Sequence, residues 1–146
     1  LEQKSVTAVA ACQYSRRLGW ADKLMAWDWS ERNTFGRKDN SKENNWGVTP
    51  LKYEKDYGFE TVGATATGFI LIKKEFLDGY VFDGETDGQD VMLGLHINGY
   101  KETPKPDRNL VINWEVKTVH IGNEADGELR MFRSPHCKTK VKGYDE

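Results

Sequence analysis

The stretch "TGFILIKKEFLDGYVFDGETDGQDVMLGLHINGYK", residues 67–101, decides the fold that we predict for this chain. Residues 68–72 are apolar on both faces, which predicts a central β-strand covered on each side of a sheet. The turn-rich, acidic run at 78–88 follows, and Asp90 then opens a segment with the apolar spacing of an amphipathic helix. Gly99 stands where such a helix is expected to stop. Strand, acidic turn and helix together predict the α/β class.

The segments on either side of this stretch add further strands. Residues 5–14 form an apolar, β-branched run that predicts a buried strand, and residues 109–122 are strand-like for the same reason. Residues 18–33 have near-helical spacing and are predicted as helix or irregular structure, although their aromatic density also suits a pair of strands. Residues 34–50 are polar and predict a long surface loop. The basic tail after Arg133 is expected to cross the surface or pack loosely.

Length and charge limit the classes of function. A chain of 146 residues is long enough for one domain with its own core. The net charge of -2 gives no basic footprint for nucleic acid, and no apolar stretch reaches the length of a membrane span. Cys12 and Cys137 lack the spacing of a metal site, and a reduced, intracellular setting is expected for them.

The residues that stand out for chemistry are two carboxylates and a group of tryptophans. Asp90 at a helix start is either a structural cap or a base that takes a proton from a substrate hydroxyl. Asp87 reads as a turn residue or as part of the same site. Trp20, Trp27 and Trp29 either fill the core or form platforms on which the C–H faces of sugar rings pack.

The order of short motifs in the second half resembles the acceptor half of a GT-A glycosyltransferase of the family 2 type. It is also similar to the compact glycosyltransferase domains of the streptomycin-pathway type. The matching motifs are Gly68 to Glu75, Phe82-Asp83, Gln89-Asp90, Gly99-Tyr100-Lys101 and the later "VKTVHIG" at 116–122. The aromatic segment 19–37 would be the variable acceptor segment of that family.

The resemblance implies a function and a set of site residues. The fold would be a GT-A-like, Rossmann-related mixed sheet with flanking helices. The reaction would move a sugar from a nucleotide diphosphate sugar to a hydroxyl of a carbohydrate acceptor, with Mn²⁺ or Mg²⁺ on the diphosphate. The implied roles are base for Asp90, metal ligand for His120, donor binding for Gly68, and acceptor binding for Trp20, Trp27, Trp29 and Asp87. A cytoplasmic protein without a nucleic-acid partner is expected, and the resemblance is compatible with peripheral association at the inner face of a membrane.

The chain departs from the family in one respect. The Asp-x-Asp motif that holds the metal and the sugar diphosphate is not found, and "DWSER" at 28–32 is no substitute. We therefore expect a single domain over 1–146 that corresponds to the C-terminal part of the full fold. Its expected parts are a strand plus acceptor segment at 1–40, a loop at 41–58, a catalytic core at 59–122 and a tail at 123–146. The alternatives are a non-catalytic carbohydrate-binding β-sandwich and an inactive glycosyltransferase remnant.

Overall fold

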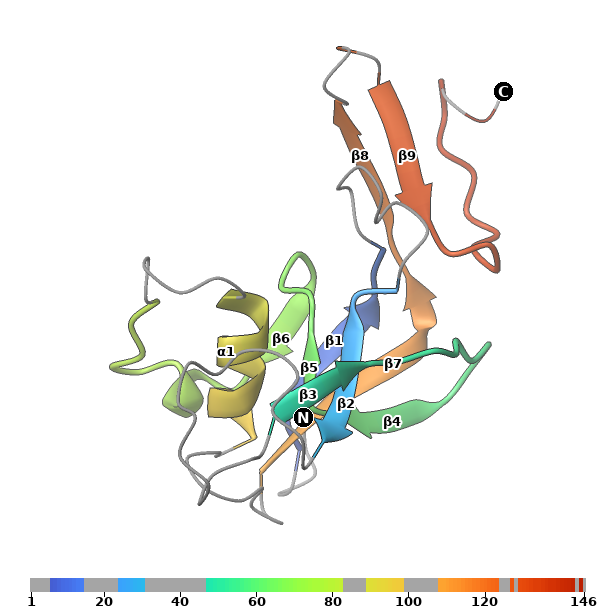
Figure 1. The fold of residues 1–146 in the computed structure, drawn as a ribbon. Coiled ribbons are helices and arrows are strands. Elements are labelled where there is room, and N and C mark those ends of the chain that lie inside the picture. The colour runs from blue at the N-terminus through green and yellow to red at the C-terminus, as the bar shows by residue number, and fades with distance from the viewer. Residues whose placement is uncertain are drawn as a thin grey trace.

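The computed structural model describes residues 6–14, 24–30, 47–82, 89–98, 108–123, 127, 129–143 and 145, with the side chains at 29, 30, 48, 123, 129 and 130 excepted. Its elements are β1 (Val6–Cys12), β2 (Ala26–Ser30), β3 (Gly47–Pro50), β4 (Phe59–Val62), β5 (Ala64–Thr65), β6 (Ile70–Ile72), the 3₁₀ helix η1 (Lys74–Phe76), α1 (Gln89–Ile97), β7 (Asn109–Lys117), β8 (Val119–Asn123) and β9 (Leu129–Arg133). Strands dominate the described part of the chain, with α1 against them (Figure 1). The protein is therefore mixed α/β, as the sequence predicted at that level.

A four-stranded mixed sheet in the order β4-β7-β1-β6 holds most of the core. β1 pairs with β7 in parallel, and the two outer pairs are antiparallel. Alternate side chains of β1 and β7 point to one face of the sheet, because successive residues of a strand face opposite sides. Those on the core face are almost completely buried: Ala8, Ala10, Cys12, Leu110, Ile112 and Trp114. The strands predicted at 5–14 and 109–122 are thus confirmed.

The prediction of a central strand at 68–72 was wrong. β6 covers only Ile70–Ile72 and lies at the edge of the sheet. Ile70 and Ile72 pack against the core, but Leu71 points the other way and is 62% exposed. The sequence of this run shows that both of its faces are apolar. It does not show which strands pair with it, and that pairing decides whether the strand lies at the centre or at the edge of the sheet.

A second, three-stranded antiparallel sheet has the order β3-β2-β5. The chain passes from the first sheet into the second at Gly63, whose backbone N–H donates to the carbonyl of Trp27 at 2.8 Å. The helix or irregular structure expected at 18–33 is replaced by strand β2 over its described part. Trp27 is buried and Asp28 exposed, which is the two-residue alternation of a strand rather than helical spacing. The loops predicted at 34–50 and 41–58 likewise contain strand β3.

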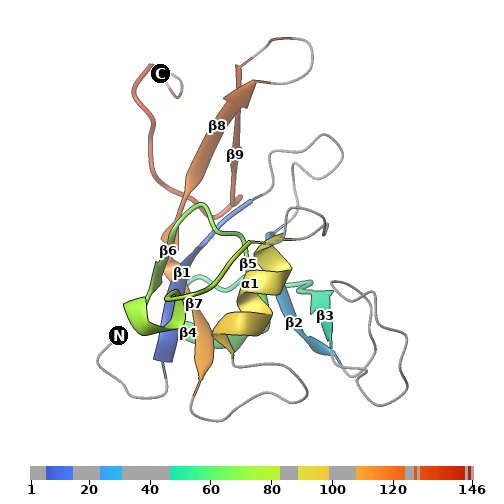
Figure 2. The ribbon, with the colours of Figure 1, turned by 90° about the vertical axis from the view of Figure 1, so that its left-hand side faces the viewer.

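The helix α1 begins at Gln89, next to Asp90, as predicted, and it covers the core beside β5 (Figure 2). Gly94 permits this close packing, because a Cβ at that position would lie 2.7 Å from Ala64 Cα, Ala64 Cβ and Gly63 O. On one side Leu93 and Ile97 join the core of the four-stranded sheet. On the other side the helix packs against Trp27.

Asn98 fixes the end of this helix. Its Nδ2 donates to the carbonyls of Val62, Gly63 and Gly94 at 3.0–3.2 Å, and its Oδ1 accepts from the backbone N–H of Leu110 at 2.9 Å. One buried amide thus joins the helix, the bend between the two sheets, and β7. The expected stop at Gly99 lies outside the described residues.

The last strands form a hairpin that projects from the body (Figure 1). The run at 109–122 is interrupted at Thr118, after which β8 leaves the sheet and pairs only with β9 among the described strands. The tail after Arg133 crosses the surface, and Arg133 ties it down by donating to Thr139 O at 3.1 Å and to the Asp145 carboxylate at 2.8 Å. The described part of the chain has no helix with the length and apolarity needed to span a bilayer.

Candidate functional site

The structure places Asp90 in the first turn of α1, half-buried, with one hydroxyl directed at it. Thr67 Oγ1 donates to Asp90 Oδ1 at 2.6 Å. A general base accepts a hydrogen bond from a hydroxyl of its substrate, whereas Thr67 belongs to the chain itself, so the general-base role of Asp90 stays a prediction. The same bond also has a structural explanation, because it links the start of the helix to the segment after β5.

Gln13 shapes the segment that brings Thr67 to Asp90. Its Nε2 donates to Ala66 O at 2.9 Å, and its Oε1 accepts from the backbone N–H of Phe69 at 2.9 Å. Between these bonds lies Gly68, where a Cβ would be 2.8 Å from Gln13 Oε1. The predicted donor-binding residue therefore lies next to Thr67, and its lack of a side chain is explained by the close approach of Gln13.

Of the four predicted acceptor residues, the structure describes only the side chain of Trp27. Trp27 is only 5% exposed and packs against Val91 and Leu95 of α1, so its indole belongs to the core and has no free face for a sugar. Trp29 lies on β2, but its side chain is not among those described. Trp20 and Asp87 lie outside the described residues.

His120, the predicted metal ligand, is exposed on β8 with its ring edge-on to Phe132, the two centroids 6.4 Å apart. β8 and α1 lie in different parts of the fold in both views, so His120 and Asp90 do not share a site (Figures 1 and 2). No three His, Cys, Asp or Glu side chains come close enough to hold a metal ion within the described ranges. The part of the chain that the structure describes therefore shows no set of side chains that would hold Mn²⁺ or Mg²⁺.

The structure instead brings together polar residues around a groove that the sequence did not predict. The groove measures about 910 Å³ and lies between the end of β7 and the segment that follows β9. Its side chains come from three separate parts of the chain. They include Asp56, Glu115, Lys117, His136, Lys138 and Thr139. Positively charged side chains, negatively charged side chains and a threonine hydroxyl therefore line the same open groove.

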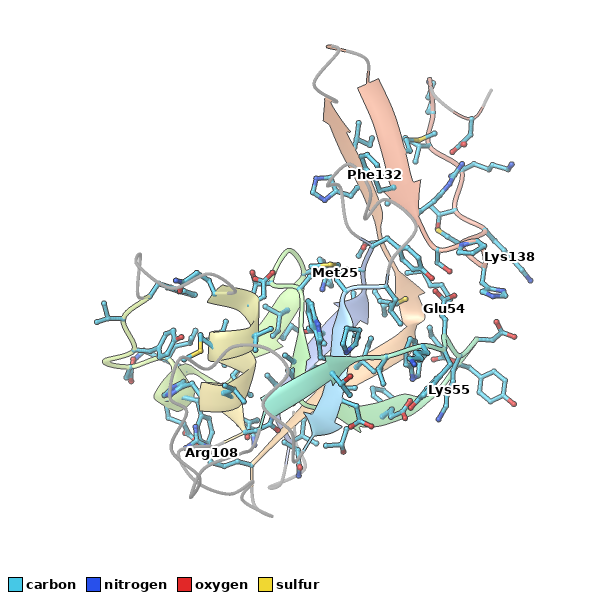
Figure 3. All side chains as sticks on the ribbon, viewed as in Figure 1. Met25, Glu54, Lys55, Arg108, Phe132 and Lys138 are labelled. Atoms are coloured by element: carbon cyan, nitrogen blue, oxygen red, sulfur yellow. The ribbon has the colours of Figure 1, made fainter. Side chains whose placement is uncertain are left out.

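A buried carboxylate, Glu54, holds the walls of this groove in place (Figure 3). It accepts hydrogen bonds from Tyr14 Oη at 2.8 Å, from Ser134 Oγ and from Lys117 Nζ at 3.2 Å. Burial alone would raise the pKa of Glu54, but the hydrogen bonds from Ser134, Tyr14 and Lys117 outweigh it, and the pKa is lowered. The carboxylate is therefore charged at neutral pH and joins the segment after β9 to the ends of β1 and β7.

The same network makes Cys12 unreactive. Burial, with the neighbouring Glu54 carboxylate as the next cause, raises the pKa of the Cys12 thiol to about 12. The thiolate is the reactive form of cysteine, so this thiol is inert near neutral pH. Both described cysteines are free, with Cys137 half-buried beside the groove.

Exposed tyrosines lie on the loop that supplies Asp56. Tyr57 is 74% and Tyr53 45% exposed, the Tyr53 ring lying 6.4 Å from the buried Trp114 ring. The Glu60 carboxylate accepts from Tyr53 Oη, from Lys55 Nζ at 3.2 Å and from Trp114 Nε1 at 3.0 Å. The hydrogen bond to Glu60, followed by burial, raises the pKa of Tyr53 to about 12. Tyr53 is held in one position, whereas Tyr57 offers its ring to solvent.

The sequence does not predict a site in this region, for identifiable reasons. The pattern at 41–58 predicts a loop and that of the tail predicts loose packing, and neither pattern indicates a binding site. A signal was present, since "YEKDYGFE" at 53–60 mixes aromatic and charged residues densely. The contact of Glu54 with Ser134 spans 80 positions of the chain, and no local pattern indicates such a pair.

Comparisons of the chain with protein-family models, with curated proteins and with solved structures find no match.

Proposed function

We propose that this chain is a non-catalytic carbohydrate-binding domain whose ligand lies in the groove beside Tyr57. The observation that supports it is an open groove with hydrogen-bonding side chains of both charges, one of which, Asp56, directly precedes Tyr57, a tyrosine that is 74% exposed. Sugars present both hydroxyl groups and apolar C–H faces, and a site that binds them needs polar groups and an aromatic surface together.

The groups of the groove match the two kinds of surface that a sugar offers. Asp56 and Glu115 accept hydrogen bonds from sugar hydroxyls, while Lys138 and Thr139 donate to ring and hydroxyl oxygens. The ring of Tyr57 packs against a C–H face. The bonds of Glu54 to Tyr14, Lys117 and Ser134 keep the walls at a fixed separation, so little ordering is needed when the ligand binds.

Binding to a panel of polysaccharides, followed by calorimetry on those that bind, tests this proposal. Tyr57→Ala should weaken binding by roughly 5- to 30-fold, which corresponds to the ~1–2 kcal/mol expected for a lost aromatic contact. Phe82→Ala is the matched control, because Phe82 is 54% exposed but belongs to the segment after η1, away from the groove. Absence of binding to every polysaccharide, or equal losses in both variants, would contradict the proposal.

A second candidate, the glycosyltransferase activity with a GT-A fold, is favoured by one observation. The hydroxyl of Thr67 lies 2.6 Å from the Asp90 carboxylate, and Gly68 is the next residue. In this candidate Asp90 takes the proton from the acceptor hydroxyl, and the segment at 66–69 lies beside the nucleotide diphosphate sugar. The antiparallel pairing of all described strands except β1 with β7, and the edge position of β6, make it the less favoured of the two.

Nucleotide binding and turnover separate the two candidates. Calorimetry with nucleotide diphosphate sugars in Mn²⁺ or Mg²⁺ should show binding if the enzyme candidate is right. Asp90→Asn should then lower turnover by roughly 10²- to 10⁴-fold, because Asn has no proton acceptor of this kind. Unfolding free energy should change little. Because the Asp-x-Asp motif is not found in this chain, absence of nucleotide binding with either metal ion would exclude sugar transfer by this chain alone, and it would leave carbohydrate binding untouched.

A further inference from the structure

Positive charge is concentrated in the part of the chain that forms one wall of the groove. The segment "LRMFRSPHCKTKVKG", residues 129–143, contains five Lys and Arg residues and no Asp or Glu, although the whole chain has a net charge of -2. The remainder of the chain is therefore acidic. We call residues 129–143 the basic strip, because the rest of the chain has an excess of negative charge.

The lysines of this strip are available to a ligand. Lys138, Lys140 and Lys142 are exposed, and none of them forms an ion pair with any residue the structure describes. Arg133 differs, because its guanidinium is paired with Asp145. Lys117 is also engaged, since its Nζ contacts Glu54 and donates to Lys55 O at 2.8 Å. Among the described side chains of residues 129–143, the charge without an ion pair is thus that of the three lysines, of which Lys140 also lies near enough to Asp145 to add to the effect of Arg133 in lowering the pKa of that carboxyl.

Two adjoining hollows present these lysines on one continuous surface. The main groove includes Lys138 and Thr139, and a second hollow of about 450 Å³ shares both residues and adds Lys140. Figure 3 shows Lys138 on the same side of the molecule as Glu54 and Lys55, with Arg108 on the opposite side. The surface of the main groove is therefore continuous with that around Lys140.

The other side of the groove has the opposite charge, which restricts the chemistry of the ligand. Asp56 and Glu115 are both exposed there, and Asp56 Oδ1 lies 3.6 Å from His136 Nδ1. Carboxylates accept hydrogen bonds from hydroxyl groups and repel phosphates. A DNA backbone presents a phosphate at every step and no free hydroxyl group, so at this wall it would meet repulsion without donating hydrogen bonds. A ligand suited to both walls has hydroxyl donors and anionic groups on the same unit.

We propose that the ligand of this groove is an acidic polysaccharide, whose carboxylate or sulfate groups contact Lys138 and Lys140 while its hydroxyl groups donate to Asp56 and Glu115. The inference rests on the proposed function and narrows it to one class of carbohydrate. Lys142 extends the strip beyond the second hollow.

Binding to matched charged and uncharged polymers tests the inference. The probes are polygalacturonate and its fully methyl-esterified form, alginate, heparin, dextran, and a 20-nucleotide single-stranded DNA. We expect at least one acidic polysaccharide to bind roughly tenfold or more tightly than the neutral polymers in 50 mM salt. This advantage should shrink strongly in 500 mM salt, because exposed charges are screened.

A pair of double variants identifies the residues responsible. Lys138→Gln with Lys140→Gln should weaken binding of the acidic polymer by roughly 5- to 10-fold and leave binding of neutral polymers unchanged. Lys73→Gln with Lys74→Gln removes the same charge beside β6 and should have little effect. The Lys138/Lys140 variant should unfold at the urea concentration of the parent protein, because both side chains are exposed. The Lys73/Lys74 variant should lose a little stability, because Lys73 is half-buried and Lys74 pairs with Asp78 at 3.0 Å.

Three other outcomes would contradict the acidic-polysaccharide inference, and one of them would also contradict carbohydrate binding. Equal binding of charged and uncharged polymers, or equal losses in the two double variants, would overturn the inference and leave carbohydrate binding intact. Tighter binding of the DNA than of any polysaccharide would overturn the inference in favour of a nucleic-acid ligand. No binding of any polysaccharide would overturn the inference and the proposed function together, and Tyr57→Ala would then have no binding to lose.

Discussion

Replacing Gly94 by alanine should destabilise this protein, although the same change stabilises most helices. In a helix interior, alanine is favoured over glycine by about 1 kcal/mol. At Gly94 the added Cβ would lie 2.7 Å from Ala64 Cα, Ala64 Cβ and Gly63 O, whereas ordinary contacts begin at 3.4 Å. Two of these atoms belong to the backbone of a buried strand junction, so they cannot turn away as the end of a long side chain does.

The magnitude follows from comparing the two effects. Extra volume forced into a packed core costs about 1–3 kcal/mol, and three simultaneous contacts with rigid atoms place this site at the upper end. After the gain in helix propensity is subtracted, Gly94→Ala should lower the free energy of unfolding by about 2 kcal/mol. For a domain of this size the midpoint of thermal unfolding should fall by roughly 6 °C.

Urea unfolding followed by tryptophan fluorescence measures this change, because Trp27 and Trp114 are 5% and 0% exposed. The midpoint should fall while the slope of the transition stays the same. Ala64→Gly in the Gly94→Ala background removes one of the three contacts and should recover part of the loss, which a double-mutant cycle detects. A Gly94→Ala protein as stable as its parent would refute the packing of α1 against the junction of β4 and β5.

Three further predictions concern buried polar groups. Glu54→Gln should lower the free energy of unfolding by roughly 3 kcal/mol at pH 7, because Lys117 loses its buried partner. Since the pKa of Glu54 is lowered in the folded state, its contribution is present above the unfolded pKa of about 4.3 and is lost as the pH falls through the folded pKa. The difference between variant and parent in urea midpoint should therefore shrink from pH 5 to pH 3, and a constant difference would argue against this network. Asn98→Ala should cost about 3 kcal/mol or more in the same assay, because it leaves two carbonyls and the N–H of Leu110 buried without partners, and a loss under 1 kcal/mol would contradict that account. A thiol reagent at pH 8 should modify one cysteine quickly in the native protein and both in urea, and mass spectrometry should locate the native label at Cys137, whereas rapid labelling of Cys12 would contradict its burial.

The sequence by itself determined the elements whose signal is local. The β-branched run at 5–14, the strand-like run at 109–122 and the apolar spacing after Asp90 each predicted the element that the structure contains. In these segments neighbouring residues already specify the backbone, because side chains two positions apart in a strand, or three to four apart in a helix, share one face.

Only the tertiary structure decided the order of the strands and the location of the polar clusters. The run at 68–72 has the same two apolar faces in the middle of a sheet or at its edge, and pairing with β1 alone left Leu71 exposed. Helical spacing at 18–33 gave way to strand β2, because pairing with β3 and β5 satisfies the backbone there. The Glu54 network joins residues up to 80 positions apart. Such contacts form only when segments that are far apart in the sequence pack together. The residue pattern within one segment does not indicate which other segment it will contact.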